Sequence, residues 1–213
     1  KAAPDGHTLL FSTSLPITVM PSLMAQIPYK AQSDLVPVAP SLQGGSVIVA
    51  GPNQPFASFK DLLAAAKAAP NSITFASYTP GSTAHIGLEL LQDAAGVKFV
   101  QIPYRQSALP DLFGGHVQIG FEPPASALSA IRAGKAKALA YTGTTRNTAL
   151  PDIPTVAEIY PGYVVNTWLG FWAPDGTPEP IVRKLNATLA GVTRHPDVAK
   201  LMNDSSAENR AET

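Results

Sequence analysis

The chain has 213 residues, of which 45% are hydrophobic and 14% are charged, with 15 basic and 15 acidic side chains. Zero net charge argues against a nucleic-acid or anionic-membrane surface, because such surfaces need a basic excess. No run of about 18 apolar residues is present to span a membrane. Without cysteine the chain has no disulfide, thiolate nucleophile or thiolate metal site. Its length fits one large domain or two small lobes.

Short strand-like runs alternate with helical patterns along the chain. In chain order we expect a strand at His7–Thr13, a helix at Ile17–Gln26, a strand at Ser46–Ala50, a helix at Ser58–Ala69, a strand at Ile73–Ser77, a helix at Thr83–Ala95, a strand at Lys98–Ile102, a helix at Ser107–Phe113, a strand at Val117–Phe121, a helix at Ala125–Ala133, strands at Lys137–Thr142 and Tyr163–Trp172, and helices at Thr177–Thr193 and His195–Met202. The four strands from Ile73 to Thr142 alternate with helices over short connections, which predicts right-handed crossovers and a parallel sheet.

Two stretches have the character of crossings between lobes, Ser41–Pro52 and Gly162–Pro174. They enclose a self-contained block of strands and helices. We therefore expect a discontinuous first lobe, residues 1–48 and 166–213, and an inserted α/β lobe, residues 49–165, joined by a hinge. The alternative is a single continuous α/β domain.

The stretch "ITFASYTPGSTAHIGLELL" (Ile73–Leu91) predicts a strand, a tight turn and a helix whose first turn lacks an acid. A helix start usually attracts Asp or Glu, because its first N–H groups are unpaired and its dipole end is positive. One interpretation is that Ser82 or Thr83 merely caps the helix. The other is that Gly81 allows close approach and that the hydroxyls and N–H groups hold an exogenous carboxylate.

Polar residues also follow other expected strands. Ser12–Ser14 follows the first strand, where α/β sheets bind ligands at the carboxyl ends of parallel strands, although an ordinary helix cap is equally consistent. Glu122 ends another strand and is either a solvated loop acid or a specificity group. Tyr104 and Arg105 end a third. Trp168 and Trp172 are more typical of core or hinge packing.

Catalytic signatures are missing from the sequence. It has no phosphate-binding loop, no dinucleotide-binding turn and no Gly-x-Ser-x-Gly nucleophile elbow. The four histidines, His7, His85, His116 and His195, are too far apart for a helical metal pair. A Ser-His-Asp triad assembled only by folding stays open, but no local pattern favours an enzyme.

Several stretches, in order and over nearly the whole chain, resemble the solute-binding proteins of tripartite tricarboxylate transporters, the TctC-like Bordetella uptake gene family. The matching pieces are "APDGHTLL" (Ala3–Leu10), "PYKAQSDLVPVA" (Pro28–Ala39), "ITFASYTPGSTAHIGLELL", "VQIPYRQSALPDLFGGHVQIGFE" (Val100–Glu122), "IRAGKAKALA" (Ile131–Ala140), "LPDIPTVAEIYPGY" (Leu150–Tyr163) and "GFWAPDGTPEPIVRKLN" (Gly170–Asn186).

The resemblance implies an α/β, two-lobed periplasmic-binding-protein fold of type II, the Venus flytrap. It implies a periplasmic binder of small carboxylates (di- or tricarboxylates, amino acids or aromatic acids) that delivers them to membrane permease subunits. We expect a monomer with no cofactor, no metal, no nucleic-acid partner and no catalytic residue.

The resemblance also implies which residues bind the ligand. Gly81, Ser82, Thr83 and His85 match the carboxylate-holding loop of the inserted lobe. Ser12, Thr13 and Ser14 match the facing loop of the other lobe. Glu122 stands where many members carry Asp, which changes the reach of the side chain.

The family normally begins with a further strand and a ligand-lining loop, and it ends with a further helix, so we expect a fold truncated at both ends. Two other functions stay open: a ligand-sensing effector module in regulation, and an unrecognised hydrolase or transferase. An appended helix-turn-helix would favour the first, and turnover of a bound ligand would favour the second.

Overall fold

The computed structural model describes residues 2–198, 200, 208 and 209. The chain divides into two compact units. Unit 1 comprises Lys1–Gly44 and Thr167–Thr213, and unit 2 comprises Gly45–Asn166. The chain therefore passes between the units twice, within both of the stretches that the sequence suggests as crossings. The assignment of these units as hinged lobes stays a prediction.

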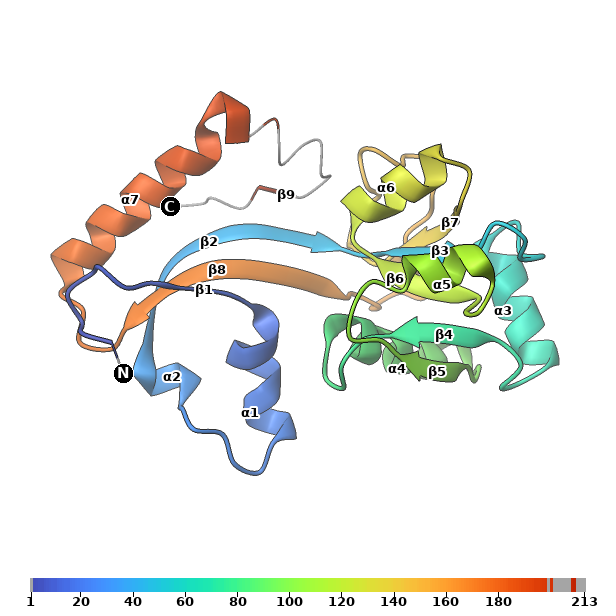
Figure 1. Ribbon diagram of the computed structural model, residues 1–213, viewed down its shortest axis with the longest axis horizontal. Coiled ribbons are helices and arrows are strands. Elements are labelled where there is room, and N and C mark those ends of the chain that lie inside the picture. Colours follow the sequence, from blue (N-terminus) through green and yellow to red (C-terminus); the bar gives the residue numbers. More distant parts are fainter. Residues whose placement is uncertain (1, 199, 201–207, 210–213) are drawn as a thin grey trace. The chain divides into compact units, whose positions relative to one another are not determined.

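Unit 2 is built on a five-stranded sheet (Figure 1). In spatial order its strands are β5 (Val100–Pro103), β4 (Thr74–Ser77), β6 (Ile119–Glu122), β3 (Val47–Ala50) and β7 (Lys137–Tyr141). Strand β4 runs parallel to β5 and β6, but β3 is antiparallel to both of its neighbours. The four strands that alternate with helices, β4 to β7, thus run in one direction, and their predicted parallel arrangement is confirmed. Strand β3 runs the other way because it enters the sheet directly from β2 (Leu35–Gly45) without a crossover helix.

Helices cover both faces of this sheet. On one face, α3 (Phe59–Ala68) and α4 (Thr83–Ala95) pack Leu62, Leu88 and Leu91 against Ile48 and Phe75. On the other face, the short α5 (Leu109–Gly114) and α6 (Pro124–Arg132) pack against the alternate strand residues. The inner strands β3, β4 and β6 are buried on both faces, which explains their apolar runs, whereas the edge strand β5 is partly exposed.

The helix ends of unit 2 follow local sequence signals. The Ser58 side chain caps α3 by accepting a hydrogen bond from the Asp61 N–H at 3.2 Å. Helix α4 ends at Gly96, which has a left-handed φ of 62° that glycine adopts without strain. The 3-10 helix η2 (Val156–Glu158) begins with a capping box between Thr155 and Glu158.

Unit 1 has a sheet of order β1 (Leu10–Thr13), β8 (Asn166–Pro174), β2 and β9 (Glu208–Asn209). Strand β1 is antiparallel to β8, and β2 is antiparallel to β9. Helix α7 (Glu179–Arg194) packs Val182, Leu185 and Leu189 against the sheet at Val38, Ala39 and Ala173. The remaining elements are the π-helix η1 (Leu15–Val19) and the single turns α1 (Met20–Leu23) and α2 (Ala31–Asp34).

Several expectations for unit 1 need correction. The eleven-residue β2 is not predicted, because Pro37, Pro40 and the Gly44-Gly45 pair interrupt its pattern. The helix expected over Ile17–Gln26 is instead η1 followed by α1. The last expected helix, His195–Met202, lies partly outside the described residues.

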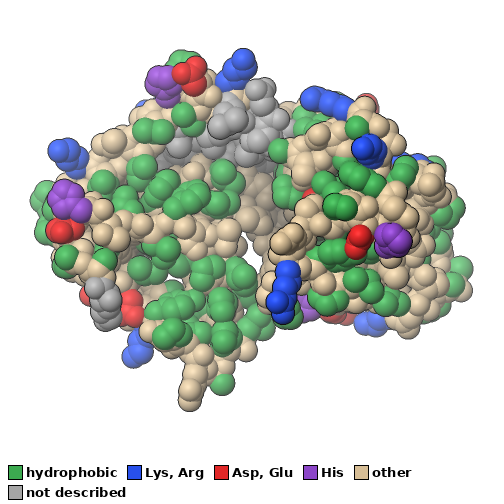
Figure 2. All heavy atoms as spheres, in the orientation of Figure 1, with side chains coloured by type: hydrophobic (Ala, Val, Ile, Leu, Met, Phe, Trp, Pro, Cys, Tyr) green, Lys and Arg blue, Asp and Glu red, His purple; other side chains and the backbone are tan. Residues whose placement is uncertain are grey.

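In the view of Figure 2, hydrophobic side chains gather on unit 1, whereas Lys and Arg side chains are scattered. The exposed large hydrophobic residues of unit 1 include Leu10, Phe11, Leu23 and Met24. Over the described part of the chain, no helix is both long and apolar enough to cross a membrane.

Candidate functional site

One edge of the unit 2 sheet gathers most of the polar residues that the sequence singles out. The carboxyl ends of β4, β5 and β6 meet at this edge, because these strands are parallel and adjacent. Val47, at the start of the antiparallel β3, pairs with Glu122 at the end of β6 and with Tyr141 at the end of β7. The edge therefore carries the β4–α4 turn, Glu122 and the residues that follow β7.

The β4–α4 turn is held by its own hydrogen bonds. Gly81 has a φ of 82°, in the left-handed region that favours glycine. The Gly81 N–H donates to Nδ1 of His85 at 3.1 Å, and the Ser82 N–H donates to the Thr79 carbonyl at 2.9 Å. Because Nδ1 of His85 accepts, Nε2 of the neutral ring carries the proton and can donate elsewhere.

The first turn of α4 is capped by Ser82, whose hydroxyl accepts a hydrogen bond from the His85 N–H at 3.2 Å. The predicted cap is therefore confirmed, and the first turn contains no acid. Among residues 2–198, 200, 208 and 209, the structure gives the Ala84 N–H no acceptor. The helix start thus keeps a main-chain donor, the Ser82 hydroxyl proton and a positive dipole end for an anion.

Glu122 is a buried carboxylate, with only 1% of its surface exposed, and is not a solvated loop acid. The Tyr78 hydroxyl donates to one of its oxygens at 3.2 Å, and the Ser126 hydroxyl donates to the other at 3.2 Å. Burial raises the pKa of Glu122, and the two hydrogen bonds from Ser126 and Tyr78 oppose that rise. Burial and the neighbouring Glu122 raise the pKa of Tyr78 to about 12. Glu122 therefore ties the residue before the β4–α4 turn to the first turn of α6.

At the end of β5, the Tyr104 hydroxyl donates to the Asp111 carboxylate at 2.8 Å. Burial and this carboxylate raise the pKa of Tyr104 to about 12. Its hydroxyl thus holds α5 against the sheet, while Arg105 is exposed.

In unit 1, Ser12 and Thr13 lie within β1, and Ser14 follows it at the start of η1. Their expected position at the end of a parallel strand is wrong, because β1 pairs antiparallel with β8. Ser14 is buried, and its side chain makes no capping hydrogen bond. The alternative of an ordinary helix cap therefore has no support in the geometry.

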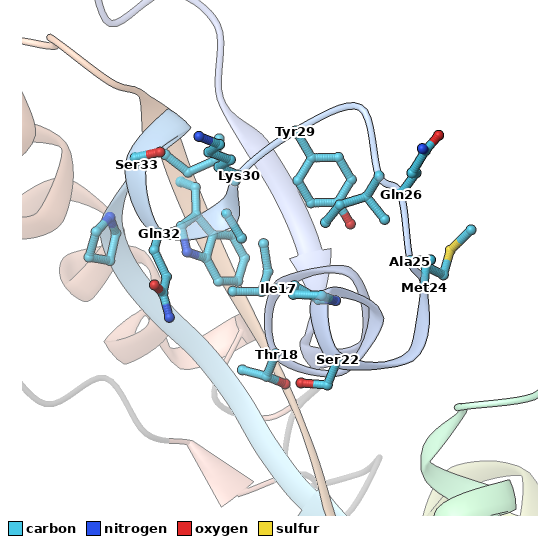
Figure 3. Close-up of a pocket in the computed structure, with 16 residues that line it drawn as sticks. Ile17, Thr18, Ser22, Met24, Ala25, Gln26, Tyr29, Lys30, Gln32 and Ser33 are labelled. Atoms are coloured by element: carbon cyan, nitrogen blue, oxygen red, sulfur yellow. The ribbon is translucent and has the colours of Figure 1, made fainter.

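Unit 1 also has a pocket of about 1110 Å³ that the sequence does not suggest. It is lined by residues of η1 and α1, by most residues from Met24 to Leu35, and by Pro37 and Trp172 (Figure 3). The hydroxyls of Thr18 and Ser22 lie at one side of the close-up, and Tyr29 lies at another. None of the predicted ligand-binding residues lines this pocket.

Sequence reasoning missed two residues at the unit 2 edge, Tyr78 and Ser126. No spacing or motif distinguishes them, since each acts through a hydrogen bond to Glu122 that forms only on folding. In the part of the chain that the structure describes, no group of three His, Asp or Glu side chains could hold a metal ion.

The model of the tripartite tricarboxylate transporter family receptor matches residues 1–212. This chain belongs to that receptor family. Protein BugT of Bordetella pertussis is 41% identical over 190 residues, which are 87% of this chain and 58% of BugT. A Pseudomonas protein of the tcbD-tcbE intergenic region is 35% identical over 95% of this chain and 61% of its own length. The chain therefore spans about three fifths of these curated relatives.

Solved structures show the same fold. The R. palustris protein Rpa4515 with adipate has a TM-score of 0.89 and 28% identity, over 98% of this chain and 71% of its own. The periplasmic binding protein BugD has a TM-score of 0.88 and 31% identity, over 99% and 71%. MatC from Rhodopseudomonas palustris with bound malate has a TM-score of 0.84 and 30% identity, over 97% and 71%. The predicted α/β periplasmic-binding-protein fold is thus confirmed, in a family of receptors rather than of enzymes.

Proposed function

We propose that this receptor captures a small carboxylate outside the cytoplasm and delivers it to the permease subunits of a tripartite tricarboxylate transporter. The observation that carries the proposal is the acid-free, serine-capped start of α4 at the edge of the unit 2 sheet. Two structural relatives are described with adipate and with malate, both small carboxylates. A periplasmic location and a monomeric state belong to the same proposal.

The helix start is chemically suited to a carboxylate. A helix dipole contributes about 0.3–1 kcal/mol, and up to about 2 kcal/mol when it is partly buried. Each hydrogen bond to a charged group adds about 1.5–3 kcal/mol. Two or three such bonds supply much of the roughly 8 kcal/mol that micromolar affinity requires. The hydrogen bonds therefore outweigh the dipole.

We assign the donors to residues of the β4–α4 turn. The Ser82 hydroxyl and the Ala84 N–H in the first turn of α4 are the proposed donors to the carboxylate. Gly81 shapes the turn, and His85 fixes it through Nδ1. Ser12, Thr13 and Ser14 are the proposed ligand-binding residues of unit 1, and Glu122 supports the turn through its hydrogen bond with Tyr78.

The test is a binding screen of the full-length protein with Thr83→Glu and Thr83→Ala variants. A panel of dicarboxylates, tricarboxylates, amino acids and aromatic acids is added while thermal unfolding is followed. A ligand at a hundredfold excess over Kd stabilises the parent protein by about 2.7 kcal/mol. Thr83→Glu places a fixed negative charge at the helix start, so we expect this stabilisation to vanish, whereas Thr83→Ala should lose less.

Stability without ligand is the control. An acid in the first turn of a helix is favourable by about 0.3–1 kcal/mol, so Thr83→Glu should not lower the melting temperature. Lost binding is then not lost folding. Carboxylate binding by Thr83→Glu at the parent affinity would place the anion elsewhere and contradict the proposal.

A further inference from the structure

Asn166 carries an unexplained polar atom. Its side-chain oxygen Oδ1 is buried and has no hydrogen-bond partner among the described residues. A buried acceptor without a donor is costly, and native structures keep few of them. Asn166 ends unit 2, at the first residue of β8.

The segment before Asn166 is fixed against α4. The Tyr163 hydroxyl donates to the Gly87 carbonyl at 3.0 Å. A Cβ built on Gly87 would lie 3.1 Å from Cγ1 of Val165, so the chain passes close to the helix at this point. Gly87 lies four residues after Thr83, and residues at this spacing share one face of a helix. The segment thus meets α4 one turn from its proposed anion-binding start.

The burial of its neighbours indicates which side of the chain Asn166 faces. Tyr163 and Val165 are buried, whereas Val164 between them is 46% exposed, which is the two-residue alternation of an extended chain. Asn166 therefore lies on the Val164 side. Its oxygen is nevertheless shielded from solvent.

Thr142 fixes the same segment from the sheet. Its hydroxyl donates to the Val165 carbonyl at 2.7 Å and accepts from the Ser46 N–H at 2.8 Å. Thr142 directly follows β7, and Ser46 directly precedes β3. Asn166 is thus held at the edge of the sheet that carries Glu122 and the β4–α4 turn.

We infer that Asn166 is a specificity-determining residue whose Oδ1 accepts a hydrogen bond from a donor group on the ligand. The inference rests on the proposed function and names its ligand class more closely. The ligand is an acid that carries a hydroxyl or ammonium group besides its carboxylate. A site built to bond such a group discriminates against the analogue without it, because the protein acceptor is then left unpaired.

Matched pairs of acids test this inference by calorimetric titration of the full-length protein. The pairs are succinate with malate and with aspartate, propionate with lactate and with alanine, and benzoate with 4-hydroxybenzoate. Where a pair of acids binds, we expect the donor-bearing acid to bind roughly 5- to 150-fold more tightly than its plain analogue. This is the affinity difference expected when a buried acceptor gains or loses its donor.

Asn166→Leu removes the acceptor and keeps a similar side-chain size. We expect it to weaken binding of the donor-bearing acid, to leave or improve binding of the plain acid, and so to abolish the preference. Asn166→Asp keeps an acceptor at the same place but adds a negative charge. This variant should still bind the ammonium-bearing acid more tightly than the plain acid, but it should bind every acid more weakly than the parent protein does.

Asn53→Leu is the matched control. Asn53 is exposed and follows β3 at the opposite edge of the same sheet, so this variant should bind every acid as the parent does. Thermal unfolding without ligand checks the fold, and Asn166→Leu should not be less stable, since it removes an unpaired buried group.

The outcomes separate the two proposals. Carboxylate binding with a preference that Asn166→Leu leaves unchanged would overturn the role of Asn166 and keep the proposed function. A preference for a keto acid such as oxaloacetate over malate would mean that the amide nitrogen faces the ligand, which also overturns it. If no acid on the panel binds, the proposed function fails and this inference fails with it.

Discussion

Gly81 sets the geometry of the β4–α4 turn, because its left-handed φ of 82° is strained for any residue with a Cβ. We expect Gly81→Ala to destabilise the protein by about 1–2 kcal/mol and to weaken carboxylate binding. Urea unfolding measures the loss of stability, and titration with the acid that the panel selects measures the loss of affinity.

Gly96 offers the control for this variant. It ends the same helix with a φ of 62° and has no atom within 4 Å of a built Cβ. Gly96→Ala should therefore cost a similar stability but leave affinity unchanged. Equal losses of affinity in both variants would show that strain in α4, rather than the turn, controls binding.

Glu122 makes stability depend on pH. Burial raises its pKa in the folded protein above the ordinary value of about 4.3. The folded state then holds the proton more tightly than the unfolded state does, so the contribution of this group is present at low pH and is lost as pH rises through the folded pKa.

In Glu122→Gln this contribution is absent. The stability of the parent relative to Glu122→Gln should therefore fall as pH rises from about 4 towards neutrality. Urea unfolding of both proteins at several pH values measures the difference. A difference that is flat or that grows with pH would mean that the carboxylate is not destabilised by burial.

At the residue scale, the sequence indicates groups that act locally and misses those that act at a distance. The Ser82 cap and the acid-free first turn are visible in "PGSTAH", because a cap and its helix are adjacent in the chain. The bond from Tyr78 to Glu122 joins residues far apart in the sequence, so no local pattern predicts it.

At the scale of elements, the same distinction holds. The helix Thr83–Ala95 is predicted at its observed bounds, since both its cap and its terminal glycine are local signals. Strand β3 is predicted, but its antiparallel direction is not, because the direction depends on which strands it pairs with in space. Strand β2 is not predicted either, because its prolines and glycines break the local strand pattern. Its place in the sheet, between β8 and β9, is set by pairing in space.

Thr142 joins three segments of unit 2 with a fully buried hydroxyl. Thr142→Val keeps the shape of the side chain but leaves the Ser46 N–H and the Val165 carbonyl without their partner. We expect a loss of about 1–3 kcal/mol in the free energy of unfolding. Thr188→Val is the comparison, since Thr188 lies on the exposed face of α7 and its hydroxyl donates to the Lys184 carbonyl one turn earlier, so its loss should matter little. Equal effects of the two variants would contradict the structural role of Thr142.

For the whole molecule, two compact units joined by two chain crossings predict hinge closure on ligand. Small-angle scattering of the full-length protein should show a smaller radius of gyration at saturation with the bound acid than without it. Thr83→Glu under the same conditions should show no change. An unchanged radius in the saturated parent protein would rule out closure.

The central claim is that the start of α4 binds the carboxylate, and amide NMR spectra test it most directly. During titration with the acid that the panel selects, the amide signals of Thr83 and Ala84 should shift saturably and with one Kd, because a carboxylate at hydrogen-bonding distance perturbs the donors it contacts. If these signals stay fixed while those lining the unit 1 pocket, such as Thr18, Ser22 and Lys30, shift at saturation, the ligand binds there and the account is wrong.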